Sequence, residues 1–282
     1  MNIIVCIKQV PNTKEVRINT ETNNIIREGV PSILNPADAN AIEAALSIRE
    51  KKGGTVCAVS MGPQQSADVL QEALDMGADR GILLSDRMVA GSDTLATGYA
   101  LSAMIKTLNA DLVLCGAEAI DGCTGQVGPI IAENLGWPQF TYVNSVEITN
   151  GCLKIKRDMR DTFELYECKL PAVVCVLKGI NIPRKSKDSD KRPEIISVKE
   201  IDAEEEYLGM KGSPTRVSKI VFSGKSMSSF VSVDGSLPVR SRIRILMNGG
   251  MSPKKISFVR GEAKELADRI LEDEVLRGQI VK

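Results

Sequence analysis

The first 137 residues alternate short apolar runs with segments whose apolar residues recur at helical spacing. The runs at 3–10, 55–61, 80–86 and 111–117 are almost continuously apolar, as is typical of strands buried on both faces of a parallel sheet. The segments between them predict helices, including about 66–76 and 125–135; their apolar faces include Ala41, Ala44, Ala45, Ile48, Leu101, Met104, Ile105 and Leu108. Such alternation predicts an α/β fold, a three-layer Rossmann-like parallel sheet with helices on both faces.

The pattern changes after Pro138, where an Asn150-Gly151 pair separates two strand-like runs. This pair suits a type I′ turn, so residues 140–160 predict a hairpin that follows the core, and 162–167 and 171–178 predict further strands. Residues 178–193 are rich in Lys, Arg and Pro and predict a loop. Residues 197–282 look too poor in apolar residues to fold alone, apart from an amphipathic segment that carries Ala263, Leu266, Ala267 and Ile270. We therefore expect an extended C-terminal arm, distinct from a domain at 1–196, that packs on a partner.

Charge and composition exclude several classes of function. Lys plus Arg equals Asp plus Glu at 36 each, so the chain has no overall field to attract nucleic acid or an anionic membrane. No run approaches the ~18 apolar residues of a membrane span. The chain has 7 Cys, without a C-x-x-C pair, and we expect most of them to be core thiols of a cytoplasmic protein, without a metal site. It has no His, which removes the commonest general base and the usual nucleophile–base pairs.

Four polar segments follow or enter predicted elements at one edge of the expected sheet: 8–12, 35–38, 60–63 and 116–129. Ligands of open parallel sheets bind beyond the carboxyl ends of the strands, so these segments predict a binding site. In the last one, Gly122, Gly125 and Gly128 allow close backbone approach, Thr124 and Gln126 are donors, and the following helix favours a phosphate at its N-terminus. Asp38 and Asp121 are candidate acceptors for ribose hydroxyls or an adenine amino group.

The same residue types also serve as caps and turn formers in ordinary strand–helix connections, and spacing alone leaves both interpretations open. The usual phosphate-binding signatures, G-x-G-x-x-G after the first strand and the Walker A sequence, are absent. Residues 85–97 form another connection from a predicted strand to a predicted helix. There, Asp93 is either a plain N-cap or one of several polar groups, with Thr94 and Thr97, that point into the same crevice.

Together these segments resemble the β subunit of electron-transfer flavoproteins. The resemblance covers most of the chain to about residue 217, in VCIKQVPNT, ILNPADANAIEAAL, VSMGP, ALDMGADRGILLSD, GAEAIDGCTGQVGPIIAENLGWPQFTYV, KLPAVVCVLKGINIPR and GMKGSPTRV. It implies an adenine-nucleotide-binding domain in an obligate heterodimer with an α subunit that carries redox-active FAD. It places these residues around the adenosine and phosphates: Cys6, Asn35, Pro36, Ala37, Asp38, Met61, Gly62, Gly116, Ala119, Asp121, Gly122, Cys123, Thr124, Gly125, Gln126 and Val127.

The family has two groups. Members that only shuttle electrons hold structural AMP here, whereas members that bifurcate electrons hold a full FAD. Bifurcating members oxidise NADH and send electrons to ferredoxin or flavodoxin and to an acyl-CoA or hydroxyacid dehydrogenase. SDRMVAGSDTLATGYALS resembles the second group, and it implies that Val89, Gly91, Asp93, Thr94 and Thr97 surround the flavin half.

The chain departs from the family pattern in three places. The family usually has Gln and Asp where this chain has Glu118 and Cys123. The recognition loop, residues 181–196, is longer than in shuttle members and charged at 185–193, which implies a different docking partner. An insert around 223–250 has no explanation in the family pattern.

Three hypotheses follow, and none of them assigns a catalytic residue to the chain, because a bound cofactor would supply the chemistry. The first is an FAD-binding subunit of a bifurcating electron-transfer flavoprotein. The second is a non-bifurcating carrier subunit that holds structural AMP. The third is an adenine-nucleotide-binding regulatory module without a redox role.

Overall fold

The computed structural model describes residues 1–12, 17–18, 25–26, 31–149 and 151–215. The predicted C-terminal helix and the insert around 223–250 lie outside these residues. Within them, no helix has the length and apolar character needed to cross a membrane.

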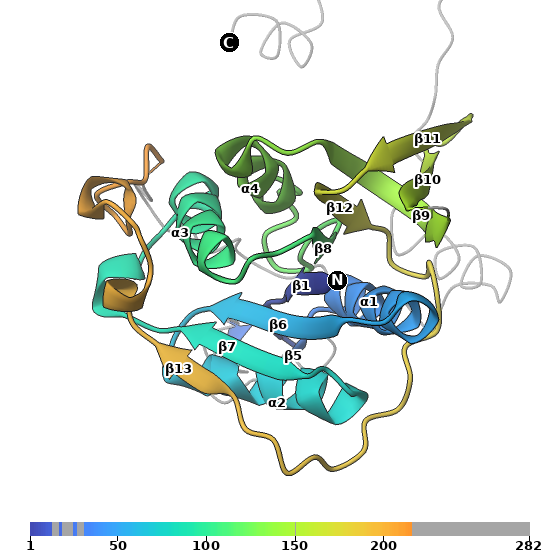
Figure 1. Ribbon diagram of the computed structural model, residues 1–282. Helices are drawn as coiled ribbons and strands as arrows, with labels where there is room; N and C mark the ends of the chain where they lie inside the picture. Colours follow the sequence, from blue (N-terminus) through green and yellow to red (C-terminus); the bar gives the residue numbers. More distant parts are fainter. Residues whose placement is uncertain (13–16, 19–24, 27–30, 150, 216–282) are drawn as a thin grey trace, which may run out of the picture. The chain divides into compact units, whose positions relative to one another are not determined.

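The centre of the fold is a nine-stranded sheet in the order β11-β10-β9-β12-β8-β1-β6-β7-β13 (Figure 1). These strands are β11 (Phe163–Lys169), β10 (Cys152–Asp158), β9 (Gln139–Thr149), β12 (Ala172–Val176), β8 (Leu112–Gly116), β1 (Asn2–Cys6), β6 (Thr55–Met61), β7 (Arg80–Leu84) and β13 (Glu194–Ile196). All neighbours from β9 to β13 pair in parallel. The predicted α/β fold with a parallel sheet is therefore confirmed.

The predicted hairpin is present and forms one end of this sheet. β10 pairs antiparallel with both β9 and β11, and Thr149 faces Cys152 across the turn. Because β9 also pairs with β12, the hairpin continues the main sheet and is not a separate unit after it. Two short antiparallel pairs, β2 (Gln9–Pro11) with β5 (Ser32–Leu34) and β3 (Arg17–Ile18) with β4 (Ile25–Ile26), complete the strands.

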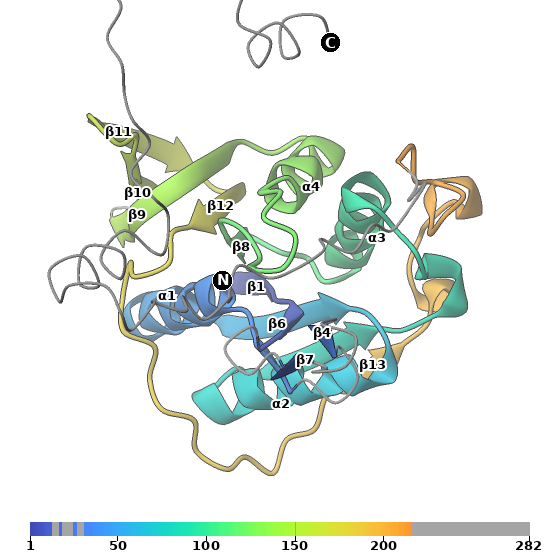
Figure 2. The same cartoon turned by 180° about the vertical axis from the view of Figure 1, so that it is seen from behind.

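In the described part of the chain, four α-helices cover the two faces: α1 (Pro36–Lys52), α2 (Ala67–Met76), α3 (Thr94–Thr107) and α4 (Val127–Leu135). Side chains alternate across β1, so that Ile3 and Val5 join the core beneath α1 and α2, whereas Ile4 and Cys6 join the core beneath α3 and α4. Figures 1 and 2 show these two helical layers from opposite sides of the molecule. The connections that the structure describes contain the single-turn helices η2 (Gln64–Ser66), η3 (Arg87–Val89), η4 (Val198–Glu200) and η5 (Glu205–Tyr207).

The predicted loop 181–196 begins as a loop but ends in a strand, which corrects the prediction for its last three residues. β13 is an edge strand that pairs with β7. A strand of three edge residues is too short to show a periodicity that sequence analysis can detect. Before β13, the backbone N–H groups of Lys187 and Ser189 donate to the carbonyl and carboxylate oxygens of Asp75 at the end of α2.

The start of this loop is fixed on α1. Asn181 donates to the carbonyl oxygen of Asn40 and accepts hydrogen bonds from the Asn40 amide. Arg184 forms a bidentate pair with Glu43, at 2.8 and 2.9 Å, and a second pair with Glu50. Between these anchors Ile182 is 91% exposed. The Asn-x-Pro-Arg element therefore presents one apolar side chain from a fixed backbone.

Candidate functional site

The strand order reverses at β1. The chain passes from β1 to β6 and β7 on one side, and then crosses to β8 and β12 on the other. The carboxyl ends of β1 and β8, at Cys6 and Gly116, are the point where ligands of such sheets bind. The predicted residues Cys6, Met61 and Gly116 all end strands at this edge.

Asp38, in the first turn of α1, joins the ends of β1 and β8. Its Oδ2 accepts a hydrogen bond from the backbone N–H of Lys8 (2.8 Å), and its Oδ1 accepts one from that of Gly116 (3.1 Å). The carboxyl group is buried, and burial raises the pKa of Asp38 to about 7, although these hydrogen bonds and one from Asn35 oppose the increase. A Cβ at Gly116 would overlap Asp38 and lie 2.8 Å from the Cβ of Ala37, which explains the glycine. Both carboxylate oxygens therefore already have backbone partners, whereas the sequence suggested a ligand contact.

Residues 117–126, the β8–α4 loop, are held by side chains from neighbouring elements. Asn35, which is 1% exposed and precedes Pro36, donates to the carbonyl oxygen of Glu118 and accepts from the N–H of Ile120. Lys8 Nζ donates to both carboxylate oxygens of Asp121, at 2.8 and 2.7 Å. The loop also folds on itself, because the N–H of Cys123 donates to the carbonyl oxygen of Ala119. The structure thus fixes the start of this loop on Asn35, at the N-cap of α1, and its middle on Lys8.

The end of the β8–α4 loop presents backbone donors that other protein groups do not use. Within the described part of the chain, the N–H groups of Thr124, Gly125 and Gln126 have no hydrogen-bond acceptor. Gly125 has a φ of +61°, a conformation that favours glycine. Free N–H groups at the start of a helix, with the positive end of its dipole, suit an anion such as a phosphate. The residues present therefore fit the phosphate end of a nucleotide.

Helices α3 and α4 meet at the same edge. Thr94 Oγ1 at the start of α3 donates to Gln126 Oε1 at the N-cap of α4, at 2.8 Å. A Cβ at Gly98 would overlap the side chain of Ile130, so the glycine allows the two helices to pack closely. Thr97, one turn into α3, is partly exposed. Two helix N-termini therefore border one edge of the sheet, and contacts from Thr94 and Thr97 to a ligand stay a prediction.

The other three residues predicted around the flavin are engaged with a later part of the chain. Val89 is buried in the core beneath α3. A Cβ at Gly91 would overlap the Met210 side chain. Asp93 caps α3 by accepting from the N–H groups of Leu95 and Ala96, and its other oxygen accepts from the N–H and hydroxyl of Thr215, at 3.1 and 2.8 Å. The cap interpretation of Asp93 is thus observed, and a contact from Asp93 to a ligand stays a prediction.

The remaining glycines and cysteines of the prediction have distinct surroundings. A Cβ at Gly128 would overlap the Cys175 sulfur, whereas one at Gly122 would meet nothing within 4 Å. Cys6 and Cys175 flank Cys115 in register on adjacent strands. These three and Cys57 are buried, as expected for core thiols, whereas Cys123 is exposed with a φ of +50°. Met61 and Gly62 end β6 at the same edge, and Gly62 donates to Leu84 of β7 and not to the β8–α4 loop.

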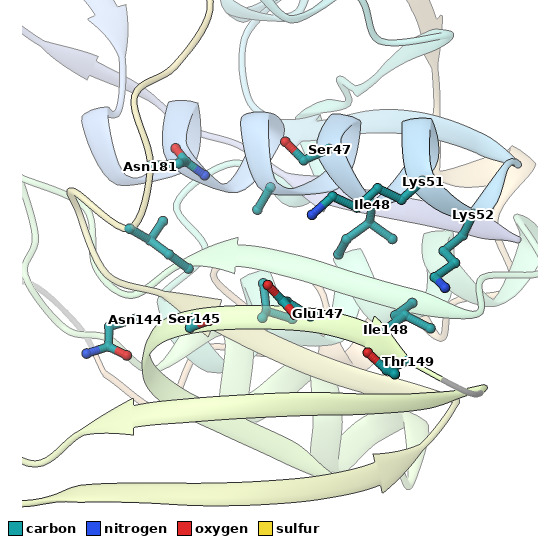
Figure 3. Close-up of a pocket in the computed structure, with 13 residues that line it drawn as sticks. Ser47, Ile48, Lys51, Lys52, Asn144, Ser145, Glu147, Ile148, Thr149 and Asn181 are labelled. Atoms are coloured by element: carbon teal, nitrogen blue, oxygen red, sulfur yellow. The ribbon is translucent and has the colours of Figure 1, made fainter.

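A separate groove of about 360 Å³ lies between α1 and β9 (Figure 3). Ser47, Lys51 and Lys52 border it on one side and Glu147 on the other, and the buried Asn144 Oδ1 beside it has no partner among the described residues. None of the residues that line this groove belongs to the predicted site. This groove and the candidate site are therefore different places.

Sequence reasoning missed three residues that shape the site. Lys8 was placed at the correct edge but was not included among the site residues, although its position directly after β1 was a usable signal. Ser213 and Thr215 both bond to Asp93, and Ser213 Oγ accepts from its N–H at 2.8 Å. No local pattern connects residues so far apart in sequence, so only the tertiary structure shows this contact.

Comparison with known proteins gives a consistent result. Residues 22–203 match the model of the electron transfer flavoprotein domain. The "Electron transfer flavoprotein subunit beta" of Clostridium acetobutylicum is 48% identical over 225 residues, 78% of this chain and 87% of that one. The "Caffeyl-CoA reductase-Etf complex subunit CarD" of Acetobacterium woodii is 46% identical over 225 residues, 77% of this chain and 86% of that one. "Protein FixA" of Azorhizobium caulinodans is 40% identical over 235 residues, 78% of this chain and 84% of that one.

Proposed function

Because the chain belongs to the electron transfer flavoprotein family, as a β subunit that transfers electrons beside an α subunit, we propose that it binds FAD at the carboxyl edge of its sheet. The observation that carries this proposal is the convergence of the β8–α4 loop, the first turn of α1 and the N-termini of α3 and α4 on one edge. When bound, FAD would accept and pass on electrons, while the chain would bind and position the cofactor.

The proposed roles of the residues follow from their placement. The free N–H groups of Thr124, Gly125 and Gln126 would hold phosphate oxygens. The partly exposed Thr97 would donate to the half of the cofactor that extends along α3, whereas the Thr94 hydroxyl, which donates to Gln126, would accept from it. Asp38 would act indirectly, by keeping the ends of β1 and β8 together. The absence of His fits this assignment, because electron transfer needs no general base.

We further propose that the heterodimer bifurcates electrons from NADH, towards ferredoxin or flavodoxin and towards a flavin-dependent acyl-CoA or hydroxyacid dehydrogenase. The support is the stretch 85–102, together with the similarity to a subunit named for a caffeyl-CoA reductase complex. The free cysteines suit a reducing cytoplasm. The prediction that residues 197–282 form an arm on the α subunit stays a prediction; its first part, to Thr215, packs on the segment around Asp93.

One observation favours the second candidate, a carrier subunit with structural AMP. Val89 is buried in the core and Asp93 is bonded by Thr215, so two of the five residues predicted around the flavin are already engaged within the chain. AMP needs only the part of the site around the β8–α4 loop.

The test is to co-express the chain with its α subunit, denature the purified heterodimer and quantify the released nucleotides. Two FAD per heterodimer supports the proposal, and one FAD with one AMP supports the second candidate. Release of an adenine nucleotide without any flavin would instead indicate the non-redox regulatory module, and release of no nucleotide would refute the site itself.

A further inference from the structure

We infer that Lys8 is a positioning residue whose ion pair with Asp121 holds the β8–α4 loop in the shape that receives the phosphates. This inference rests on the proposed nucleotide site and adds a residue that neither the sequence motif nor the comparisons assign. The pair crosses the point where the strand order reverses, since Lys8 follows β1 and Asp121 follows β8.

The backbone of Lys8 is fixed, so its side chain starts from a defined place. Its N–H donates to Asp38 at 2.8 Å, and its carbonyl oxygen accepts from the N–H of Asn35 at 3.0 Å. Both partners belong to the start of α1. From this fixed point Lys8 Nζ reaches both oxygens of Asp121. Asp121 Oδ1 also accepts from the N–H of Gly122, so the carboxylate shapes the loop as well as anchoring it.

The Lys8–Asp121 pair matters because of its position along the β8–α4 loop. Asn35 holds the loop as far as Ile120, and Thr94 holds its end at Gln126. Among the side-chain contacts found in the described residues, the Lys8–Asp121 pair is the last anchor before the free N–H groups of Thr124 and Gly125. Without it, the stretch from 121 to 125 would keep only bonds within the loop, such as that from Cys123 to Ala119. A loop that must be ordered on binding holds its ligand less tightly.

A different role is conceivable for the same geometry, namely a direct contact from Lys8 to a phosphate. The two roles make opposite predictions for a charge exchange. A positioning pair keeps part of its function when the charges are swapped, as in K8D/D121K, because the ion pair is kept although the acceptor for the N–H of Gly122 is lost. A phosphate ligand does not, because the swap places a carboxylate at position 8.

The experiment measures the rate at which the heterodimer, loaded with radiolabelled AMP, exchanges it for unlabelled AMP, and repeats the measurement with FAD. The variants are K8M, D121N and K8D/D121K. Asp121→Asn keeps an acceptor for the N–H of Gly122 and removes only the charge. K154M is the matched control, because it breaks a Lys–Glu pair of 3.1 Å between β10 and β11, away from the loop.

Lys8 and Asp121 side chains are 51% and 30% exposed, so the expected effect is modest: K8M and D121N each speed exchange about two- to fivefold. The inference also requires K8D/D121K to return towards the wild-type rate, K154M to match it, and the nucleotide-free variants to keep the wild-type Tm. Slow exchange in D121N with fast exchange in K8M and the swap would overturn it in favour of a direct phosphate contact. Unchanged rates in both single variants would overturn it too. A wild-type heterodimer that binds neither AMP nor FAD would instead refute the proposed function.

Discussion

The substitution Gly98→Ala, which adds a single methyl group, is a test of how closely α3 and α4 pack at their N-termini. A Cβ added at Gly98 would lie 2.8 Å from the Cβ of Ile130 and closer still to its Cγ2. The optimum separation of carbon atoms is about 3.5–4.0 Å, so α3 and α4 would have to move apart by several tenths of an ångström or more. Gly98→Ala therefore acts on the contact that brings Thr94 to Gln126.

The magnitude follows from two opposing effects. In a helix interior, Ala is more favourable than Gly by about 1 kcal/mol. Overpacking of a well-packed contact costs about 1–3 kcal/mol. We expect G98A to lower the free energy of unfolding by up to about 2 kcal/mol, since the second effect is the larger one. In an Ile130→Ala background, which removes the closest overlapping atom, the same substitution should cost about 1 kcal/mol less.

The assay is urea denaturation of the heterodimer for wild type, both single variants and the double variant, at one protein concentration. Nucleotide content, measured on the same samples, should fall in G98A and recover in part in the double variant. Equal destabilisation by G98A in both backgrounds would show that Ile130 is not the group that Gly98 accommodates. G98A with higher stability than wild type would refute the close packing of the two helices.

Two further predictions concern buried carboxyl groups. The folded-state pKa of Asp38, about 7, lies above its ordinary 3.8, so the folded state binds the extra proton and stability from this group falls as the pH rises from about 4 to about 7. At about 1.4 kcal/mol per pKa unit, the free energy of unfolding of the wild type should fall by at most about 4 kcal/mol relative to that of D38N over this pH range. Urea titrations at several pH values measure this difference. A difference that does not change with pH would contradict the prediction. Burial alone would raise the pKa of Glu43, but hydrogen bonds from Arg184 lower it. Arg184→Met should therefore lower the free energy of unfolding by about 2 kcal/mol at pH 8. The decrease should be smaller at pH 5, because Glu43 can take up a proton there once Arg184 no longer pairs with it. An equal decrease at both pH values would exclude this explanation.

Much of the fold could be predicted because buried parallel strands are recognisable in the sequence as almost continuously apolar runs. β6 matches the predicted 55–61 residue for residue, and the apolar faces of α1 and α2 are buried as their spacing indicates. The pairing of β9 with β12 could not be predicted, since a hairpin pattern specifies only its local partner. β13 was missed because three residues at a sheet edge are too few to show a period.

The candidate site was harder to predict, because the same carboxylate side chain can accept hydrogen bonds either from a ligand or from backbone N–H groups. Asp38 was predicted as a ligand acceptor on residue type and position, and Asp93 as either a plain N-cap or a polar group that points into the crevice. The structure engages their oxygens with N–H groups of Lys8, Gly116, Leu95 and Ala96 and with both donors of Thr215. Leu95 and Ala96 follow from the N-cap position of Asp93, whereas Lys8, Gly116 and Thr215 come from distant parts of the chain, which no spacing rule reveals. The glycine-rich β8–α4 loop was predictable, because its free donors are local to one helix start.

The anchored Asn-x-Pro-Arg element has a consequence for how such a subunit diversifies. The folding energy of this element resides in Asn181 and Arg184, whereas Ile182 between them is almost fully solvated. A replacement at 182 thus alters the outward surface without disturbing the backbone that carries it. The outward surface and the folding contacts are thus assigned to different side chains, so position 182 can vary with little risk to the scaffold.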